Sequence, residues 1–226
     1  MEGFKDTAMA SQNPEISSVS VVLIGSFNPQ IFQPTWFSCE ELIRKEEAEA
    51  AKIQIIHPEV VVFDLEWLRM EVTRDRFVAI TEKESSFDIL RDLVLGTFRI
   101  LRHTPIRMMG LNRDMHFRMA SEEEWHAVGH RLAPKEPWNG IIEKPGMRTL
   151  IMQGKRPDDF KGFIVVRVEP SLRVPQGVHI QVNDHYQIED QKAMDGCDII
   201  MGILDSSWKT SQERSKKIIY DLMEAK

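Results

Sequence analysis

The chain has 226 residues, of which 42% are hydrophobic and 28% are charged. This composition can supply a buried core and excludes a mainly disordered chain. The 35 acidic and 29 basic residues give a net charge of −6, which disfavours non-specific nucleic-acid binding without excluding a local basic patch.

The cysteines and the apolar runs indicate the compartment. Cys39 and Cys197 form no CxxC pair, so they predict neither a zinc ribbon nor a redox motif, and two isolated thiols are typical of a reducing environment. The first residues lack the basic and apolar regions of a signal peptide, and no apolar run is long enough to span a membrane. We therefore expect a cytoplasmic protein without a membrane segment, and a flexible tail over residues 1–17.

The first half of the chain predicts one strand, a helix, four strands and a second helix. Two capping-box patterns mark the helix starts, Ser38 with Glu41 and Ser85 with Asp88. The turn at Arg74 and Asp75 joins the last two strands as a hairpin. The predicted elements are a strand over 19–25, a helix over 39–51, strands over 53–57, 60–65, 68–73 and 77–81, and a helix over 86–102.

The second half predicts the same order of elements. Its helix starts are marked by Ser121 with Glu124 and by Thr210 with Glu213. The predicted elements are a strand over 106–110, a helix over 122–132, strands over 147–153, 162–169, 178–188 and 198–204, and a helix over 210–224.

This repetition predicts an internal duplication. Each opening strand ends in a glycine followed by an asparagine, Gly25 with Asn28 and Gly110 with Asn112. We expect an α+β protein of two pseudo-repeats, each strand–helix–four strands–helix, which form a curved antiparallel sheet with helices packed on one face. The repeats would cover residues 18–103 and 104–226 in one compact unit. The alternative is an accidental alternation of helices and strands.

Two resemblances accompany these patterns. The order of elements resembles the duplicated fold of the TATA-box-binding protein, which implies a saddle-shaped sheet and carries no functional motif. Residues 104–112 are similar to an Arg-x-Gly-Leu-Arg-Tyr-x-Asn stretch in a sporadically distributed bacterial family of uncharacterised proteins. The chain keeps the step from Gly110 to Leu111 and loses the following Arg-Tyr. That resemblance implies a bacterial protein and no particular activity.

The strand predicted over 178–188 carries the clearest candidate for a binding surface. Apolar residues share one parity, with Asp184 as the exception, which indicates one buried and one exposed sheet face. The other parity holds a ladder of amide and imidazole groups that can bind a protein or peptide partner: His179, Gln181, Asn183, His185 and Gln187. The alternatives are an ordinary solvent face and a hairpin turning at Asn183 and Asp184. Acid–base catalysis by Asp184 and His185 requires such a turn, because neighbours on a strand point to opposite faces.

A metal site is the second candidate. His126 and His130 lie four residues apart on a predicted helix, with Glu122 one turn earlier, so these side chains share one helix face. The residue after His126 is Ala127, which excludes the zincin arrangement. The alternative is a solvated helix face on which histidines pair with glutamates.

These observations lead to three hypotheses about function. Walker, GxGxxG, HExxH and GxSxG motifs are absent, so we expect a non-enzymatic binding module without a cofactor, with a protein or peptide partner and a homodimer as one possibility. The first alternative is a metal-dependent hydrolase or nuclease that uses His126 and His130. The second is a nucleotide or small-molecule sensor that binds between the two repeats.

Overall fold

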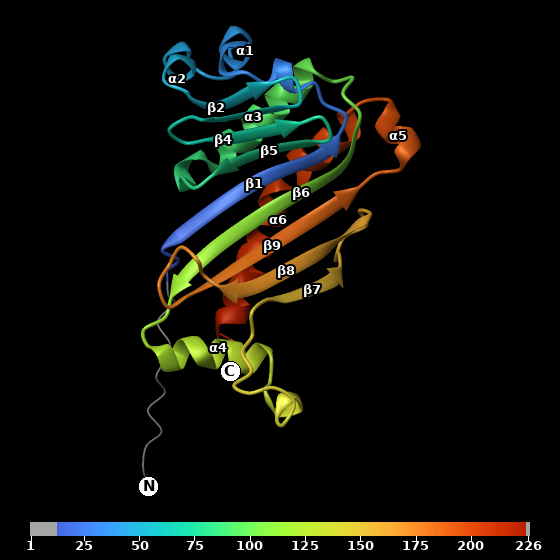
Figure 1. Ribbon diagram of the computed structural model, residues 1–226. Coiled ribbons are helices and arrows are strands. Elements are labelled where there is room, and N and C mark those ends of the chain that lie inside the picture. Colours follow the sequence, from blue (N-terminus) through green and yellow to red (C-terminus); the bar gives the residue numbers. More distant parts are fainter. Residues whose placement is uncertain (1–12, 225–226) are drawn as a thin grey trace.

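A single antiparallel sheet organises the protein. The structure is a computed structural model that describes residues 13–224 (Figure 1). Its nine-stranded sheet has the order β2-β3-β4-β5-β1-β6-β9-β8-β7. The strands are β1 (Ile16–Gly25), β2 (Lys52–His57), β3 (Val60–Asp64), β4 (Arg69–Thr73), β5 (Arg76–Thr81), β6 (Ile106–Arg118), β7 (Leu150–Lys155), β8 (Gly162–Pro170) and β9 (Gly177–Gln187).

The helices connect and cover these strands. The α-helices are α1 (Pro34–Cys39), α2 (Lys45–Glu49), α3 (Phe87–Ile100), α4 (Glu122–Leu132), α5 (Asp190–Met194) and α6 (Asp198–Glu224). Three short 3-10 helices add η1 (Pro29–Ile31), η2 (Glu84–Ser86) and η3 (Glu136–Trp138). The prediction of an α+β protein with a curved antiparallel sheet is confirmed.

The two long strands β1 and β6 pair with each other at the centre of the sheet. From β1 the sheet continues outwards through β5, β4 and β3 to β2, and from β6 it continues through β9 and β8 to β7. The strands on the two sides therefore follow mirrored paths, but the second half has one strand fewer. Evolutionary duplication stays a prediction.

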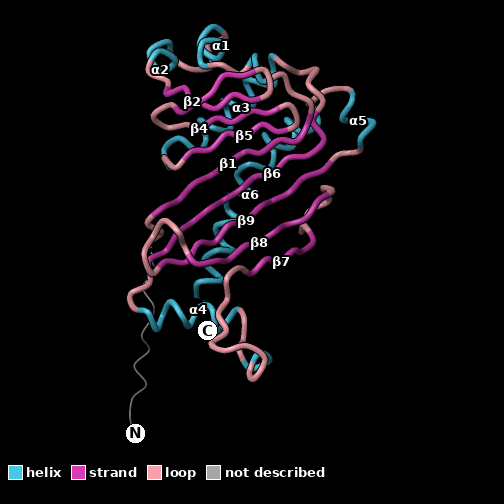
Figure 2. The backbone as a smooth tube through the Cα atoms, in the orientation of Figure 1, coloured by secondary structure: helices cyan, strands magenta, loops and turns pink. Residues whose placement is uncertain are grey.

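Side chains that alternate along each strand explain why the helices cover one face only. Figures 1 and 2 show α3 and α6 behind the strands, with α1 and α2 at one end of the sheet and α4 at the other. One apolar core joins α3 and the start of α6 to β1, β3, β4, β5 and β6. A second core joins α4 and the end of α6 to β6, β8 and β9. The other face of the sheet, called the open face below, has no helix over it among residues 13–224.

The prediction of a strand over 198–204 is wrong, and so is the prediction that the last helix starts at Thr210. Both segments belong to α6, a helix of 27 residues. Its buried residues recur with helical spacing, from Ile200 and Leu204 through Ser211 to Ile219. A short apolar run looks the same in a buried strand and in a buried helix, which is why the sequence pattern misled.

The predicted helix over 39–51 is also wrong, because the chain forms two short helices there. Ser38 lies inside α1, and Glu41 adopts a φ of 58°, which ends the helical path. The second helix has its own capping contact, in which the Arg44 backbone N–H donates to the Glu47 carboxylate at 2.9 Å. The capping pattern of Ser38 and Glu41 is not followed by an apolar stripe, and it predicted a helix start that the structure does not have.

Two predicted helices are confirmed in place. The Ser121 hydroxyl caps α4 by accepting a hydrogen bond from the Glu124 N–H at 3.2 Å. The helix over 86–102 corresponds to α3, but the predicted cap Ser85 lies inside η2, and the N-cap residue is Ser86, whose side chain makes no capping bond. The proposed tail over 1–17 falls largely outside the described residues, and Ile16 and Ser17 belong to β1. Among residues 13–224, no helix is long and apolar enough to cross a bilayer.

Candidate binding face of the sheet

The predicted polar ladder lies on the open face. His179, Gln181, Asn183 and His185 are half-buried on β9, and Gln187 is exposed at its end. The intervening residues of β9 point to the helices and are buried, from Val178 to Tyr186. The alternation predicted for 178–188 is thus present in the structure, and the strand runs through Asn183 and Asp184 without a turn.

A second polar row on β6 faces this ladder, and the sequence prediction missed it. In the register of the two strands, Gly110 lies opposite His185, Asn112 opposite Asn183, Asp114 opposite Gln181, and His116 opposite His179. The predicted strand ended at Gly110, whereas β6 continues to Arg118. The missed signal is the period-two alternation of Leu111, Met115 and Phe117 with polar residues, interrupted only by Arg113.

Hydrogen bonds join these rows across the strands. The Gln181 amide donates to the Asp114 carboxylate at 2.8 Å, and the His179 Nε2 lies 2.9 Å from the same oxygen. The Asn112 amide donates to the Ser20 hydroxyl on β1 at 3.0 Å. The centre of the open face is therefore a preorganised set of short polar side chains, which hold one another in place.

Two stacked imidazoles lie at one end of this polar centre. The rings of His116 and His179 are 4.2 Å apart and almost parallel, at 7°. The His179 Nδ1 also lies 3.3 Å from Glu169, so both of its ring nitrogens face carboxylates. Burial alone would lower the pKa of His179, but its hydrogen bonds to Asp114 and Glu169 outweigh burial and raise the pKa.

The neighbouring His116 has the opposite protonation preference. Its Nδ1 lies 2.8 Å from the Ser171 hydroxyl, in the loop between β8 and β9. Burial, followed by the charges of His179 and Arg173, lowers the pKa of His116 to about 4. The stack therefore favours a neutral His116 ring on a charged His179 ring.

This arrangement predicts a stability that falls in mild acid. An unfolded histidine has a pKa of about 6.5, so between pH 6.5 and 4 the unfolded state binds a proton at His116 that the folded state does not bind. At about pH 5 this extra proton on the unfolded state should lower the free energy of unfolding by about 2 kcal/mol. His179 acts in the opposite direction and stabilises the folded state, because its pKa is raised by folding. This stabilisation is fully present below the pKa of the unfolded state and is lost as the pH rises through the pKa of the folded state.

The measurement is urea denaturation of the wild type and His116→Asn at several pH values. The asparagine keeps a polar group near Ser171 and does not titrate. We expect the stability difference between the two proteins to shift in favour of the variant as the pH falls from 6.5 to about 5. Parallel pH profiles would show that His116 does not control this acid sensitivity.

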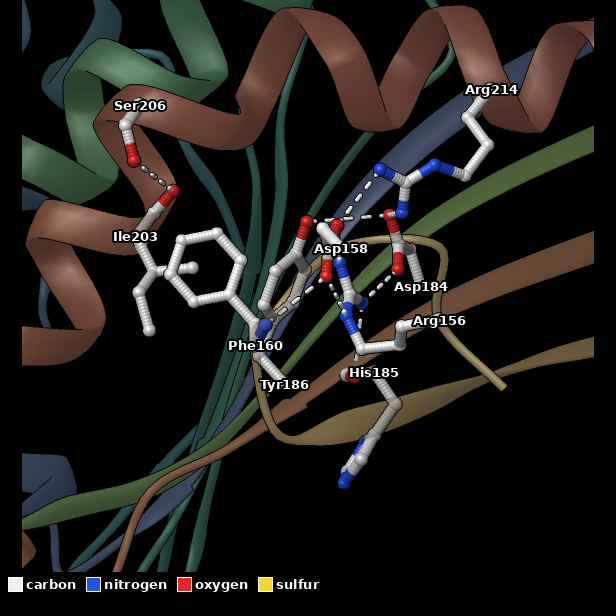
Figure 3. Close-up of polar contacts among 9 residues, drawn as sticks. All are labelled: Arg156, Asp158, Phe160, Asp184, His185, Tyr186, Ile203, Ser206 and Arg214. Carbon is white, nitrogen blue, oxygen red and sulfur yellow. Dashed lines mark hydrogen bonds and ion pairs between the residues drawn. The ribbon is translucent and has the colours of Figure 1, made fainter. Parts of the chain in front are cut away.

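A network of buried ion pairs holds β9 from its other face. Figure 3 shows Arg156 and Arg214 converging on Asp158 and Asp184. Arg214, on α6, donates to Asp184 at 3.1 Å and to Asp158 at 2.9 Å. Arg156 contacts Asp184 and donates to Asp158 at 2.7 Å. The guanidinium of Arg156 also lies over the Tyr186 ring, 3.7 Å from its centroid.

The charges in this network balance, which assigns it a structural role. Two arginines meet two aspartates, and the Asp184 side chain is 0% exposed. Burial alone would raise the pKa of Asp158, but hydrogen bonds from Arg156 and Arg214 lower it overall. The network therefore ties the segment after β7 to β9 and α6, and so supports the strand that carries the polar ladder.

The structure separates the residues of the proposed acid–base pair. Asp184 points to the helices and is bound by arginines, while the His185 ring lies on the open face and stacks on Phe163 at 4.4 Å. Burial, followed by the charge of Arg156, lowers the pKa of His185. Asp184 and His185 therefore do not form a catalytic pair.

The metal candidates lie together on exposed positions of α4. The His126 Nε2 is 3.5 Å from a Glu122 oxygen, and the rings of His126 and His130 are 6.2 Å apart. Both histidines line a small hollow of about 120 Å³, together with Trp125 and Lys135. Within residues 13–224, no three His, Cys, Asp or Glu side chains come together in a group that could hold a metal ion. The geometry thus matches histidine–glutamate pairing on a solvated helix face.

Comparisons with known proteins add no family to this description. No protein-family model matches the chain, and no curated protein matches it.

Proposed function

We propose that the chain is a non-enzymatic binding protein that takes a protein partner on the open face of its sheet. The observation that carries this proposal is the polar centre of that face, where Asp114 on β6 and the half-buried residues of β9 present carboxylate, amide and imidazole groups beside the buried Asn112 and His116. These groups donate and accept hydrogen bonds, and they are already ordered by their neighbours. A preordered surface loses little side-chain entropy when a partner binds.

The size of the open face supports a protein partner. Nine strands about 4.8 Å apart, with on average about eight residues each, span roughly 1,000 Å². A standard protein interface takes about 800 Å² from each partner. A peptide or a protein surface can therefore be accommodated without any rearrangement of the fold.

The charge on this face favours a protein over a nucleic acid. Its arginines pair with carboxylates on the same face, as Arg69 does with Asp64 at 3.2 Å and Arg76 with Glu71 at 3.7 Å. Arg167 similarly lies 3.6 Å from Glu169. Nucleic-acid binding requires a surplus of unpaired cations, and neither these pairs nor the net charge of −6 supplies one.

Site-specific photo-crosslinking in cells tests the proposal. A photoreactive phenylalanine analogue would replace Gln187 at the exposed end of the ladder or, as the matched control, Lys209 on the exposed side of α6. We expect a defined adduct from position 187 and none from position 209. Adding Val165→Arg, which places a cation opposite Asn183, should reduce the yield of that adduct by about tenfold or more.

Three outcomes would contradict this function. Adducts of equal yield at both positions would indicate non-specific capture. An adduct that Val165→Arg leaves unchanged would place the partner elsewhere. An adduct formed only with a second copy of the chain would make the open face a homodimer interface and remove the separate partner.

A further inference from the structure

We propose that β7 is a dimerisation edge, which pairs antiparallel with β7 of a second copy of this chain. The strand ends the sheet on one side, so half of its backbone N–H and C=O groups have no neighbouring strand. Its side chains from Ile151 to Lys155 are all exposed. This surface is separate from the polar centre of the open face, and the proposal does not depend on the binding function proposed above.

The edge lacks most of the features that usually prevent strands from pairing. Residues 150–154 contain no charged residue and no proline, and the one charge of β7 is Lys155 at its end. The six residues of β7 pair with β8 in an unbroken register, so no bulge twists the edge away. Ile151 is 55% exposed and Met152 is 60% exposed, on opposite faces of the strand. Exposed, regular and apolar edges of this kind are covered in stable proteins.

The opposite edge of the sheet is better protected. The register of β2 with β3 shifts between Ile53 and Ile55, which marks an irregular strand. Lys52 begins β2 just as Lys155 ends β7, so the charges at the strand ends do not distinguish the two edges. A bulge of this kind is a common protection of an edge strand. We therefore assign the contact to β7.

The sequence of β7 is complementary to itself, which favours a second copy over a foreign strand. Antiparallel pairing about a twofold axis at Met152 places Met152 opposite its partner's Met152 and Ile151 opposite Gln153. The same register places Leu150 opposite Gly154, where an added Cβ would meet nothing within 4 Å. The Leu150 side chain thus faces the open space beside the partner's Gly154. No like charges face each other across residues 150–154.

A charge-swap experiment tests this pairing. Sedimentation velocity of the full chain over a range of concentrations should show a reversible monomer–dimer equilibrium. Met152→Lys alone, and Met152→Glu alone, should each raise the dimer Kd by about fivefold or more, because like charges meet on the twofold axis. A one-to-one mixture of the two variants should restore dimers. Both substitutions fall on a mostly exposed side chain, so they leave the core unchanged.

The matched control is Ile53→Lys on the other edge, which alters a similarly exposed isoleucine and should leave the Kd unchanged. A wild-type chain that stays monomeric at every concentration would overturn the proposal. Dimers that persist unchanged in both Met152 variants, or a mixture that dimerises no better than either variant alone, would also overturn it.

Discussion

Asp184→Asn should lower the free energy of unfolding by about 3–5 kcal/mol. The carboxylate is fully buried between β9 and α6 and faces two arginines, of which Arg156 has a side chain that is only 1% exposed. The asparagine has almost the same shape, so packing is retained while the negative charge is lost. The two guanidinium groups then share one remaining carboxylate, that of Asp158, and the charge left without a counter-ion is poorly solvated.

The comparison for this variant is Asp64→Asn. Asp64 also pairs with an arginine, Arg69, at 3.2 Å, but these side chains are 29% and 44% exposed. Solvent-exposed pairs contribute about 1 kcal/mol or less, so this control should change stability little. Urea denaturation of both variants measures the difference. A loss at Asp184 no larger than the loss at Asp64 would contradict a tightly coupled buried network.

The Asp184 network also shows where prediction from the sequence ends. Period-two alternation predicted both faces of β9 and left Asp184 as the single polar residue on the apolar parity. The alternation gave no partner for that exception, because Arg156 and Arg214 lie 28 and 30 residues away in the sequence. No local pattern relates Arg156 in a loop to Arg214 on a helix, so only the three-dimensional fold reveals that they meet.

The same limit applies to the open face and to the last helix. The ladder on β9 was predictable because alternation is a local property of one strand, whereas its pairing with the row on β6 depends on sheet order.

The apolar run after Asp198 was misassigned because its length suits a strand, and the residues that continue it as a helix, such as Ser207 and Ser211, are small and polar. These serines are buried because α6 lies along the sheet, which the sequence alone does not reveal.

Gly162→Ala should be a second severe substitution, with a loss of about 3 kcal/mol or more in the free energy of unfolding. Gly162 begins β8 with a φ of +140°, a conformation that residues with a Cβ avoid. An added Cβ would lie 1.9 Å from the backbone oxygen of His185, so the two strands would have to separate. That same oxygen accepts a hydrogen bond from Arg156 at 3.1 Å, which links the strain to the buried network.

The control for this substitution is Gly202→Ala on the exposed side of α6, where an added Cβ meets nothing within 4 Å. A helix interior prefers alanine, so this variant should gain about 0.5–1 kcal/mol. Hydrogen exchange then locates the damage in Gly162→Ala, because the Gln187 amide donates to the Lys161 carbonyl beside the altered residue at 3.0 Å. Its exchange should accelerate more than that of amides in β3 and β4. Unchanged protection of the Gln187 backbone amide, or a stability equal to that of the wild type, would contradict this prediction. Either result would mean that β8 and β9 can separate at Gly162 without loosening the strand that carries the polar ladder.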